Sequence, residues 1–578
     1  ITVRLLRYLK EYTGLIIVVF IAMFLTIGIS IVNPLLIERA VDVHVANADY
    51  EGLFKLAAVA LVINIAFVFL VKLRMYVMSY ISNKIILRIR DEVYEHIQTL
   101  SFTYFDSRPT GKILARIMGD VNSLRDVFSR SVTSLIPNIL TVLTVLVIMF
   151  VKNWKLSLAS LAALPFMVVG AFWVQKTNHS RWQLHRKKVS NLSAYTHENI
   201  AGMRVVQSLN AEDETRAQFN ELAEDQCNTF IWCCRVADLY SPLADTSWAL
   251  GMMCMYLVGV KFLGPSTITL GLLMAFANYV GMFWDPVIQL SGFLNQFVTN
   301  LSAAERVFDV LDTEAEIKDA PDAADLPPVE GRVTFENVSF TYDVGTENET
   351  KVLDNVSFAV EPGETIALVG PTGAGKTTIV NLISRFYDIQ SGTIAIDGYD
   401  LKKVKINSLR KQMGVMTQDN FIFHGTVRDN IAYGKLDATD EEIIAAAKAV
   451  NAHDFIMKME KGYDTELKEQ GAGLSIGQRQ LIAFARTMVS QPRVLILDEA
   501  TSSIDTHTEI MVQKGIEALL AGRTSFVIAH RLSTIQNADR IFVINDGGIA
   551  EAGSPKELMA KRGAYYKLYM AQFATLAS

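Results

Sequence analysis

The chain has 578 residues, of which 51% are hydrophobic and 20% are charged, and its net charge is -6. Soluble domains carry about 25% charged residues, so the low charge and the mean hydropathy of +0.25 predict that part of the chain lies in lipid. This composition excludes a disordered or low-complexity chain, and 54 basic against 60 acidic residues exclude a generally basic nucleic-acid binder.

The first half of the chain contains six uncharged apolar runs: residues 14–32, 56–71, 131–151, 156–175, 246–260 and 270–284. About 20 mostly apolar residues are needed for a helix to cross a bilayer, and flanking apolar residues extend the shorter runs. Six runs together favour a transmembrane bundle over buried core helices. Because the sequence starts at Ile1, we expect a trimmed start, and no cleavable signal peptide is recognisable.

Basic residues indicate the orientation of these helices. They gather in residues 1–13 and in the two long connections after the second and fourth runs, whereas residues 38–52 are mainly acidic. The positive-inside rule therefore places both termini and both long connections in the cytoplasm. Much of each connection has a helical pattern, so we expect long cytoplasmic helical extensions. Their turns, near residues 102–110 and 202–209, would either touch the soluble domain or end ordinary solvated hairpins.

One acidic side chain stands at the end of the sixth run, where Asp285 precedes Pro286. Charged residues at membrane depth usually face a bundle interior or water. We therefore expect Asp285 to line a site for bulky amphipathic, cationic compounds together with Tyr279, Phe283 and Trp284, whose rings offer apolar area and cation–π attraction. In the alternative interpretation Asp285 pairs with Lys72, Arg74 or a residue of a partner subunit, and the rings face lipid.

A change in composition divides the chain into domains. Residues 1–311 form the expected transmembrane domain, and residues 312–331 form an acidic, proline-bearing linker. In residues 332–578, short apolar strands alternate with amphipathic helices, which predicts a soluble α/β domain. Four cysteines without a CxxC pair predict neither a disulfide framework nor a zinc site.

The strongest local signal is a match to GxxxxGK[ST], between a predicted strand at 365–369 and a predicted helix at 378–386. In this motif, glycines let backbone N–H groups surround phosphate oxygens at a helix N-terminus. Lys376 would reach the outer phosphates and Thr377 would bind Mg²⁺. The sequence therefore predicts an α/β P-loop domain that binds ATP with Mg²⁺. The expected nucleotide residues are Gly370, Pro371, Thr372, Gly373, Ala374, Gly375, Lys376, Thr377 and Thr378.

Two acidic residues end a second apolar strand, residues 494–497. Asp498 would hold the Mg²⁺ shell. Glu499 would lie beside the attacking water as general base, because water is a poor nucleophile without polarisation.

Further motifs accompany these two. Leu474-Ser475-Ile476-Gly477-Gln478 precedes an apolar helix, and Tyr342, Gln418, Asp505 and His530 stand around it in a characteristic order. With these motifs, nearly all of residues 332–578 resemble the ATP-binding cassette (ABC) family. The resemblance implies that Tyr342 stacks on adenine, that Gln418 joins Mg²⁺ and reports nucleotide state, and that His530 contacts the γ-phosphate.

The resemblance also implies a dimer. Ser475, Gly477 and Gln478 would meet ATP bound to the facing subunit, and Asp505 would align the two subunits. Six fused spans and the segment 465–471, which resembles the exporter X-loop with Glu469 at its acidic position, imply an exporter half-transporter. The usual LSGGQ signature has Ile476 at its third position here. We therefore favour a heterodimer with one weaker site, and homodimers that tolerate the change are the alternative.

These patterns together predict a six-helix transmembrane bundle fused to a nucleotide-binding domain, with Glu499, His530 and Gln418 as catalytic residues. The expected function is ATP-driven export of amphipathic compounds of the multidrug type by alternating access across a bacterial inner (plasma) membrane. A lipid or peptide translocator of the same family is one alternative. A slow ATP-gated regulator or channel is another, which the intact Glu499 and His530 disfavour.

Overall fold

The computed structural model describes residues 2–263, 268–345, 349–417, 420–498, 506–529 and 535–573. The chain forms two compact units. Unit 1 comprises Ile1–Gln98 and Thr110–Thr313, and unit 2 comprises Thr99–Pro109 and Glu314–Ser578. The short segment Thr99–Pro109 therefore belongs with the α/β unit, although the residues on both sides of it belong to the helical one.

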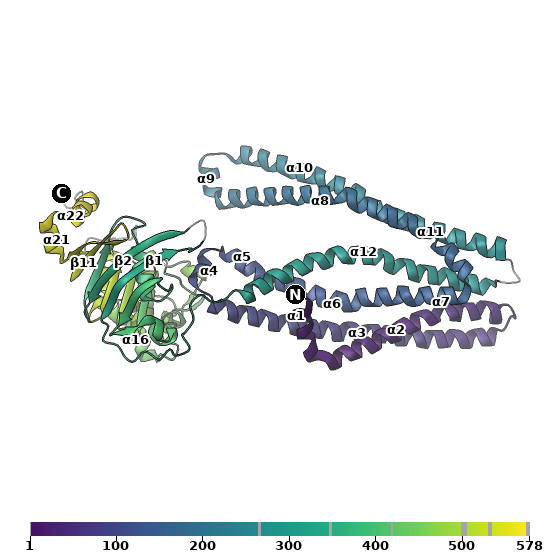
Figure 1. The fold of residues 1–578 in the computed structure, drawn as a ribbon, viewed down its shortest axis with the longest axis horizontal. Helices are drawn as coiled ribbons and strands as arrows, with labels where there is room; N and C mark the ends of the chain where they lie inside the picture. Colours follow the sequence, from purple (N-terminus) through teal and green to yellow (C-terminus); the bar gives the residue numbers. More distant parts are fainter. Residues whose placement is uncertain are drawn as a thin grey trace. The chain divides into compact units, whose positions relative to one another are not determined.

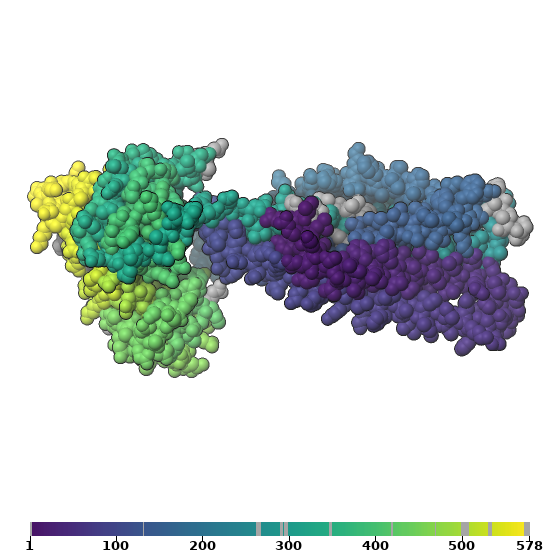
Figure 2. Space-filling model, turned by 60° about the horizontal axis from the view of Figure 1, so that its bottom comes forward, coloured from purple at the N-terminus to yellow at the C-terminus, as the bar shows by residue number. Residues whose placement is uncertain are grey.

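Unit 1 is helical, and α2 and α3 lie side by side in it (Figures 1 and 2). Large apolar side chains remain exposed along α2, α3 and α7, as expected of helices that face lipid. The helices are α1 (Thr2–Leu9), α2 (Thr13–Arg39), α3 (Tyr50–Thr99), α5 (Thr110–Ala115), α6 (Val121–Arg130), α7 (Ile136–Leu161), α8 (Leu164–Ala201), α9 (Met203–Ser208), α10 (Glu212–Ala237), α11 (Tyr240–Leu257) and α12 (Leu270–Asp312), joined by short 3₁₀ and π segments.

Among the described residues, five helical segments are long and apolar enough to cross a membrane: Val3–Val45, Tyr50–Thr99, Thr110–Leu161, Glu212–Lys261 and Leu270–Gln289. They contain five of the six expected runs.

The fourth run, residues 156–175, is divided between two helices. α7 has extended backbone angles at Asn153, where the sequence places the turn between the third and fourth runs. The Asn153 Oδ1 atom accepts hydrogen bonds from the N–H groups of Lys155 and Leu156 at 3.1 and 3.2 Å, as an N-cap does. A second break follows after Leu161, and α8 begins at Leu164. The fourth run therefore begins in the last turns of α7, after Asn153, and continues in α8 after a short break.

Polar contacts fix the end of unit 1 where α12 begins. The Thr269 Oγ1 atom accepts a hydrogen bond from the Leu272 N–H group at 3.1 Å and so caps α12. Asp42, which follows α2, accepts from the Gly271 N–H group at 2.8 Å. A Cβ atom at Gly271 would lie 2.6 Å from the Asp42 carboxyl carbon. Glycine at this position therefore lets α12 approach the end of α2.

Unit 2 contains two sheets that enclose a common apolar core with α13. Continuous apolar sequences such as that of β3 suit strands that are buried on both faces. The larger sheet has the order β12-β11-β3-β10-β9-β6, and β11, β3, β10, β9 and β6 are parallel. These strands are β12 (Gly548–Gly553), β11 (Arg540–Asn545), β3 (Thr365–Val369), β10 (Thr524–Ile528), β9 (Val494–Asp498) and β6 (Met413–Met416).

The second sheet is antiparallel, in the order β2-β1-β4-β5, and β7 and β8 form a short pair. Its strands are β1 (Val333–Tyr342), β2 (Thr350–Val360), β4 (Ser391–Ile396) and β5 (Tyr399–Asp400), and the pair is β7 (Gly425–Thr426) and β8 (Glu466–Leu467). The helices of unit 2 are α4 (Phe102–Asp106), α13 (Lys376–Ile383), α14 (Ile406–Arg410), α15 (Val427–Ala432), α16 (Asp440–Ala449), α17 (His453–Met457), α18 (Ile476–Val489), α19 (Thr506–Leu520), α21 (Pro555–Lys561) and α22 (Ala564–Phe573).

The acidic linker has little regular structure but is attached to unit 2. The backbone of Ala324 exchanges hydrogen bonds with Lys403 and Lys405 at 3.1 and 2.9 Å. The Gln412 side chain accepts from the Val329 N–H group and donates to the Leu326 carbonyl oxygen. These bonds satisfy linker backbone groups that a proline-bearing segment cannot pair internally.

Candidate nucleotide site

The predicted phosphate loop leaves the middle of the larger sheet. β3 pairs in parallel with β10 and β11, and the loop joins its carboxyl end to α13. The Nζ atom of Lys376, the first residue of α13, donates to the carbonyl oxygens of Gly370 and Pro371 at 2.8 Å each. The loop therefore wraps around the ammonium group at a helix N-terminus. Both the ammonium and the helix N-terminus favour a bound phosphate.

Two glycines of the loop have no acceptable substitute. Gly370 has φ +153°, and a Cβ atom there would lie 2.2 Å from the Ile544 carbonyl oxygen. Gly375 has φ +105°, in the left-handed half of the map, and its Cβ atom would lie 3.1 Å from Leu353. The tight path of the loop therefore requires these glycines, because L side chains rarely adopt such backbone angles.

Asp498 lies at the same edge of the sheet. It ends β9 and is in register with Ile528 of β10, which is in register with Leu368 of β3. Burial lowers the pKa of Lys376, and the negative charge of Asp498 opposes this change. The predicted cation and the predicted Mg²⁺-binding carboxylate are therefore close enough to interact.

The residues at this edge fit Mg²⁺. Thr377 is exposed and Asp498 is half-buried. Among the described residues, no three His, Cys, Asp or Glu side chains converge. Mg²⁺ usually binds one or two protein oxygens and completes its shell with phosphate and water, so Thr377 and Asp498 suit the ion better than a closed cage would.

Tyr342, the predicted adenine-stacking residue, ends β1 beside α13. Its hydroxyl lies 3.3 Å from the Thr378 Oγ1 atom, within hydrogen-bond distance. Its ring packs edge-on against Phe340 and Tyr387, with centroids 4.7 and 5.1 Å away. The ring is thus held next to the phosphate loop. Thr378, expected among the nucleotide residues, is buried and contacts Tyr342.

The signature segment forms the N-terminus of α18. The Ser475 Oγ atom accepts from the Gln478 N–H group at 3.2 Å, and the Gln478 Oε1 atom accepts from the Ser475 N–H group at 2.9 Å. This capping box leaves the Ser475 hydroxyl proton available to an outside acceptor, and Ser475 is exposed. Gly477 is buried, whereas Ile476 is 41% exposed in the first helical position.

Four predicted site residues lie outside the described residues: Gln418, Glu499, Asp505 and His530. Their roles stay predictions. The last described residues before Gln418, Glu499 and His530 are Thr417, Asp498 and Ala529, which end or directly follow β6, β9 and β10. These three parallel strands are neighbours.

α4 packs on the rest of unit 2 through residues that the sequence analysis did not single out. The Phe102 ring lies 4.4 Å from the Phe386 ring, and the Tyr387 hydroxyl donates to Asp106. Burial and Asp106 raise the pKa of Tyr387. The expectation that the turn near residues 102–110 touches the soluble domain is met. The aromatic pair Phe386-Tyr387, directly beyond α13, was the missed sequence signal.

The structure separates the four residues expected to line a substrate site. Tyr279, Phe283 and Trp284 are buried in the core of unit 1, and the Tyr279 hydroxyl donates to the Ile31 carbonyl oxygen at 3.1 Å. Asp285 is exposed. Helical periodicity explains the difference, because adjacent residues of α12 point in different directions.

Comparisons with known proteins agree with this architecture. Residues 16–287 match the ABC transporter transmembrane region, and residues 353–502 match the ABC transporter family. The chain is 39% identical to an uncharacterized ABC transporter ATP-binding protein of Bacillus subtilis, over 99% of the chain and 94% of that protein. It is 35% identical to an ATP-dependent lipid A-core flippase of Syntrophus aciditrophicus, over the same shares of each chain.

A solved structure is similar over the whole length. It is that of a bacterial Atm1-family ABC exporter with ATP bound, which is 28% identical to the chain. The similarity has a TM-score of 0.78 and covers 98% of each chain. The similarity therefore includes both the helical unit and the α/β unit.

Proposed function

The chain belongs to the ABC transporter family and couples ATP hydrolysis to transport, and on that premise we propose that it exports amphipathic compounds as one half of a dimer. The observation that carries the proposal is the phosphate loop closed around Lys376 in a chain that also has five candidate spans among its described residues.

The dimer follows from the parts available in one chain. There is one phosphate loop and one signature segment, and both present exposed residues, with Thr372 and Thr377 on one and Ser475 on the other. The Ser475 hydroxyl would donate to the γ-phosphate of ATP held by the other subunit, because its lone pair already serves the helix cap. Gly477 lets the backbone approach closely, and Gln478 holds the serine in place.

The partner is proposed to be a different half-transporter. Ile476 has ordinary helical backbone in the first turn of α18, so its effect would be steric. Its exposed side chain would crowd the partner's nucleotide and weaken one of two sites. Native mass spectrometry of the purified complex tests this: two different subunits support the proposal, and a fully active assembly of identical chains contradicts it.

Hydrolysis is assigned to residues that closely follow strands of the larger sheet in the sequence. Glu499 would take a proton from the attacking water, and His530 would contact the γ-phosphate. Thr377, Asp498 and Gln418 would hold Mg²⁺, which neutralises phosphate charge when bound. Tyr342 would stack on adenine. Asp505 would keep the two subunits in register.

Transport would follow from nucleotide-driven closure of the dimer. ATP can shift the conformational equilibrium only by binding the closed state more tightly, and hydrolysis would release that closure. The proposed location is a bacterial inner membrane, and the distribution of basic residues supports placing both termini in the cytoplasm.

Asp285 is proposed to contact the positively charged part of a substrate. Asp285 is exposed on α12, whereas Tyr279, Phe283 and Trp284 anchor the same helix in the core of unit 1. Among the described residues, no ion pair joins Asp285 to Lys72 or Arg74.

The test compares Asp285→Asn with the wild-type complex in efflux of a cationic dye and a neutral dye. We expect the efflux of the cation to fall more. Equal losses for both dyes would contradict the assignment.

One observation favours a lipid translocator as the second candidate. The Arg74 Nε atom on α3 is buried without a hydrogen-bond partner, and an unsatisfied cation at membrane depth suits an anionic head group. ATPase assays in nanodiscs with neutral and anionic lipids separate the two candidates. Stimulation by anionic lipid that is lost in Arg74→Gln would favour the lipid translocator.

A further inference from the structure

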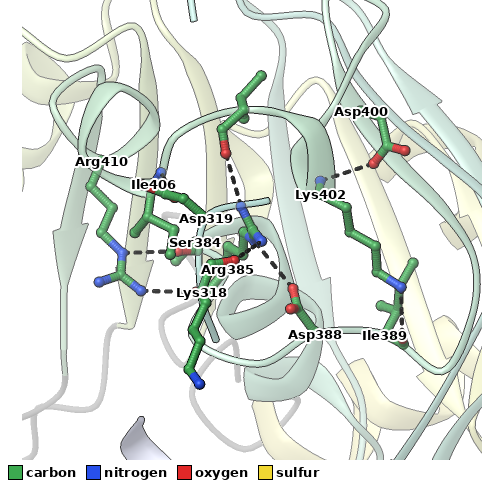
Figure 3. A network of polar contacts seen from close by, with 11 residues as sticks. Lys318, Asp319, Ser384, Arg385, Asp388, Ile389, Asp400, Lys402, Ile406 and Arg410 are labelled. Carbon is green, nitrogen blue, oxygen red and sulfur yellow. Dashed lines mark hydrogen bonds and ion pairs between the residues drawn. The ribbon is translucent and has the colours of Figure 1, made fainter. Parts of the chain in front are cut away.

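Arg385 is a buried cation directly beyond the phosphate-loop helix α13. Its side chain is only 4% exposed. The Nε atom donates to Asp388 at 3.1 Å, one Nη atom donates to the Val404 carbonyl oxygen at 2.9 Å, and the other donates to the Lys318 carbonyl oxygen at 3.2 Å (Figure 3). The planar guanidinium thus joins three separate segments, and one of them is the linker.

The backbone of Arg385 is strained. Its φ angle is +48°, a left-handed conformation that is unfavourable for a residue other than glycine. This turn ends α13 and directs the next two residues onto α4, where Phe386 contacts Phe102 and Tyr387 binds Asp106. The strain is therefore located where the nucleotide-loop helix meets the segment Thr99–Pro109.

A second arginine reinforces this turn. The Arg410 guanidinium donates to the Arg385 carbonyl oxygen at 2.8 Å and lies 4.9 Å from the centre of the Phe386 ring. Burial and the nearby Arg385 lower the pKa of Arg410. Two like charges packed together are costly, and their backbone acceptors offset that cost. Such an arrangement holds one geometry more tightly than an apolar contact would.

The linker is bound on both sides of this point. Asp319 accepts from the Ile406 N–H group at 2.8 Å (Figure 3), and Glu316 accepts from Thr103 at 2.7 Å and Ser101 at 3.1 Å. Linker, α4 and the end of α13 thus share one network. The linker and the segment containing α4 are also the two places where the chain passes between unit 1 and unit 2.

We propose that Arg385 is a positioning residue that transmits the nucleotide state of the phosphate loop, through the end of α13, to α4 and the linker at the same time. A shift of α13 on ATP binding would move the guanidinium and hence the Lys318 carbonyl. The same shift would move the Phe386 and Tyr387 side chains, which contact α4. The side-chain contacts of Arg385 are with Asp388, Val404 and Lys318, beyond the phosphate loop. This inference depends on ATP hydrolysis coupled to transport and is independent of which substrate is carried.

The test uses the full-length complex in lipid nanodiscs, with hydrogen exchange of residues 99–109 and 314–320 measured with and without Mg-ATP and vanadate. In the wild type we expect ATP to slow exchange in both segments by about fivefold or more, the lower end of usual coupling energies. Arg385→Lys keeps the charge without the planar fork, and Arg385→Gln removes both. Each variant should bind ATP within about threefold of wild type, yet show less than about twofold protection.

Arg562 provides the matched control, because it is another left-handed arginine in unit 2 (φ +50°) that is exposed and lies beyond α21. Arg562→Lys should keep full protection. Normal protection in Arg385→Lys would overturn the inference, as would loss of ATP binding in that variant, which would place the arginine in the nucleotide site itself. A merely structural arginine would lower the melting temperature while leaving the ATP-induced protection unchanged. If Arg385→Gln does not assemble, Arg385→Lys decides.

Discussion

Ser475→Ala separates a structural role of the signature serine from its role in catalysis. In the structure Ser475 caps α18 through the Gln478 N–H group, and loss of such a cap costs about 1 kcal/mol. In a domain of this size, that corresponds to a fall in melting temperature of roughly 2–4 °C. The same hydroxyl is proposed to donate to the γ-phosphate across the dimer. Losing a hydrogen bond to a charged group costs about 2 kcal/mol, or roughly a 30-fold loss of hydrolysis at the partner's nucleotide site.

Ser554→Ala is the matched control for this prediction. Ser554 caps α21 with the same reciprocal geometry, accepting from the Glu557 N–H group while Glu557 accepts from the Ser554 N–H group. Both variants should lose similar thermal stability, measured by differential scanning fluorimetry of the complex. Only Ser475→Ala should lose ATPase activity at the nucleotide site held by the partner. Comparable activity in the two variants would refute the assignment of Ser475 to the nucleotide interface.

Two further predictions follow from the fold and from the loop. Burial lowers the pKa of Lys376 below its usual 10.5, whereas a bound phosphate would favour the charged form. ATP affinity should therefore fall as the pH rises through that lowered pKa, and Lys376→Met should bind ATP weakly at every pH. Titration with a fluorescent ATP analogue at several pH values measures both effects. Asn153→Ala removes the cap at the bend in α7 and should lower the free energy of unfolding by about 1 kcal/mol. Asn153→Asp keeps a capping oxygen and should not. Equal melting temperatures for the two variants would contradict the capping role.

The phosphate loop could be predicted from the sequence because its determinants are local. Gly370 and Gly375 are required by backbone angles within a few residues of Lys376, and the apolar strand before them is continuous in the sequence. Tyr342 was also identifiable, and its contact with α13 through Thr378 is a tertiary consequence of the strand order.

Other features depend on contacts that no local pattern reveals. Arg385 binds the backbone carbonyls of Lys318 and Val404, which any residue type could supply. The core positions of Tyr279 and Trp284 depend on which face of α12 meets its neighbours, and an apolar helix with little periodicity does not indicate that face.

The break after Leu161 was missed for a related reason. Residues 156–175 contain no charge, so hydropathy alone does not mark the end of α7. The separation of the third and fourth runs around Asn153 could be predicted because polar and basic residues interrupt the apolar sequence there. Its mechanism, a side-chain cap on the next helical segment, required the structure.

The most direct test of the account measures ATP binding, ATP hydrolysis and transport in the assembled transporter with Glu499 replaced. In the assembled transporter, Glu499→Gln should bind ATP with near-normal affinity, hydrolyse it at least about 100-fold more slowly, and stop moving substrate. ATP hydrolysis and transport at the wild-type rate in that variant would contradict the account, because Glu499 is the residue assigned to activate the water.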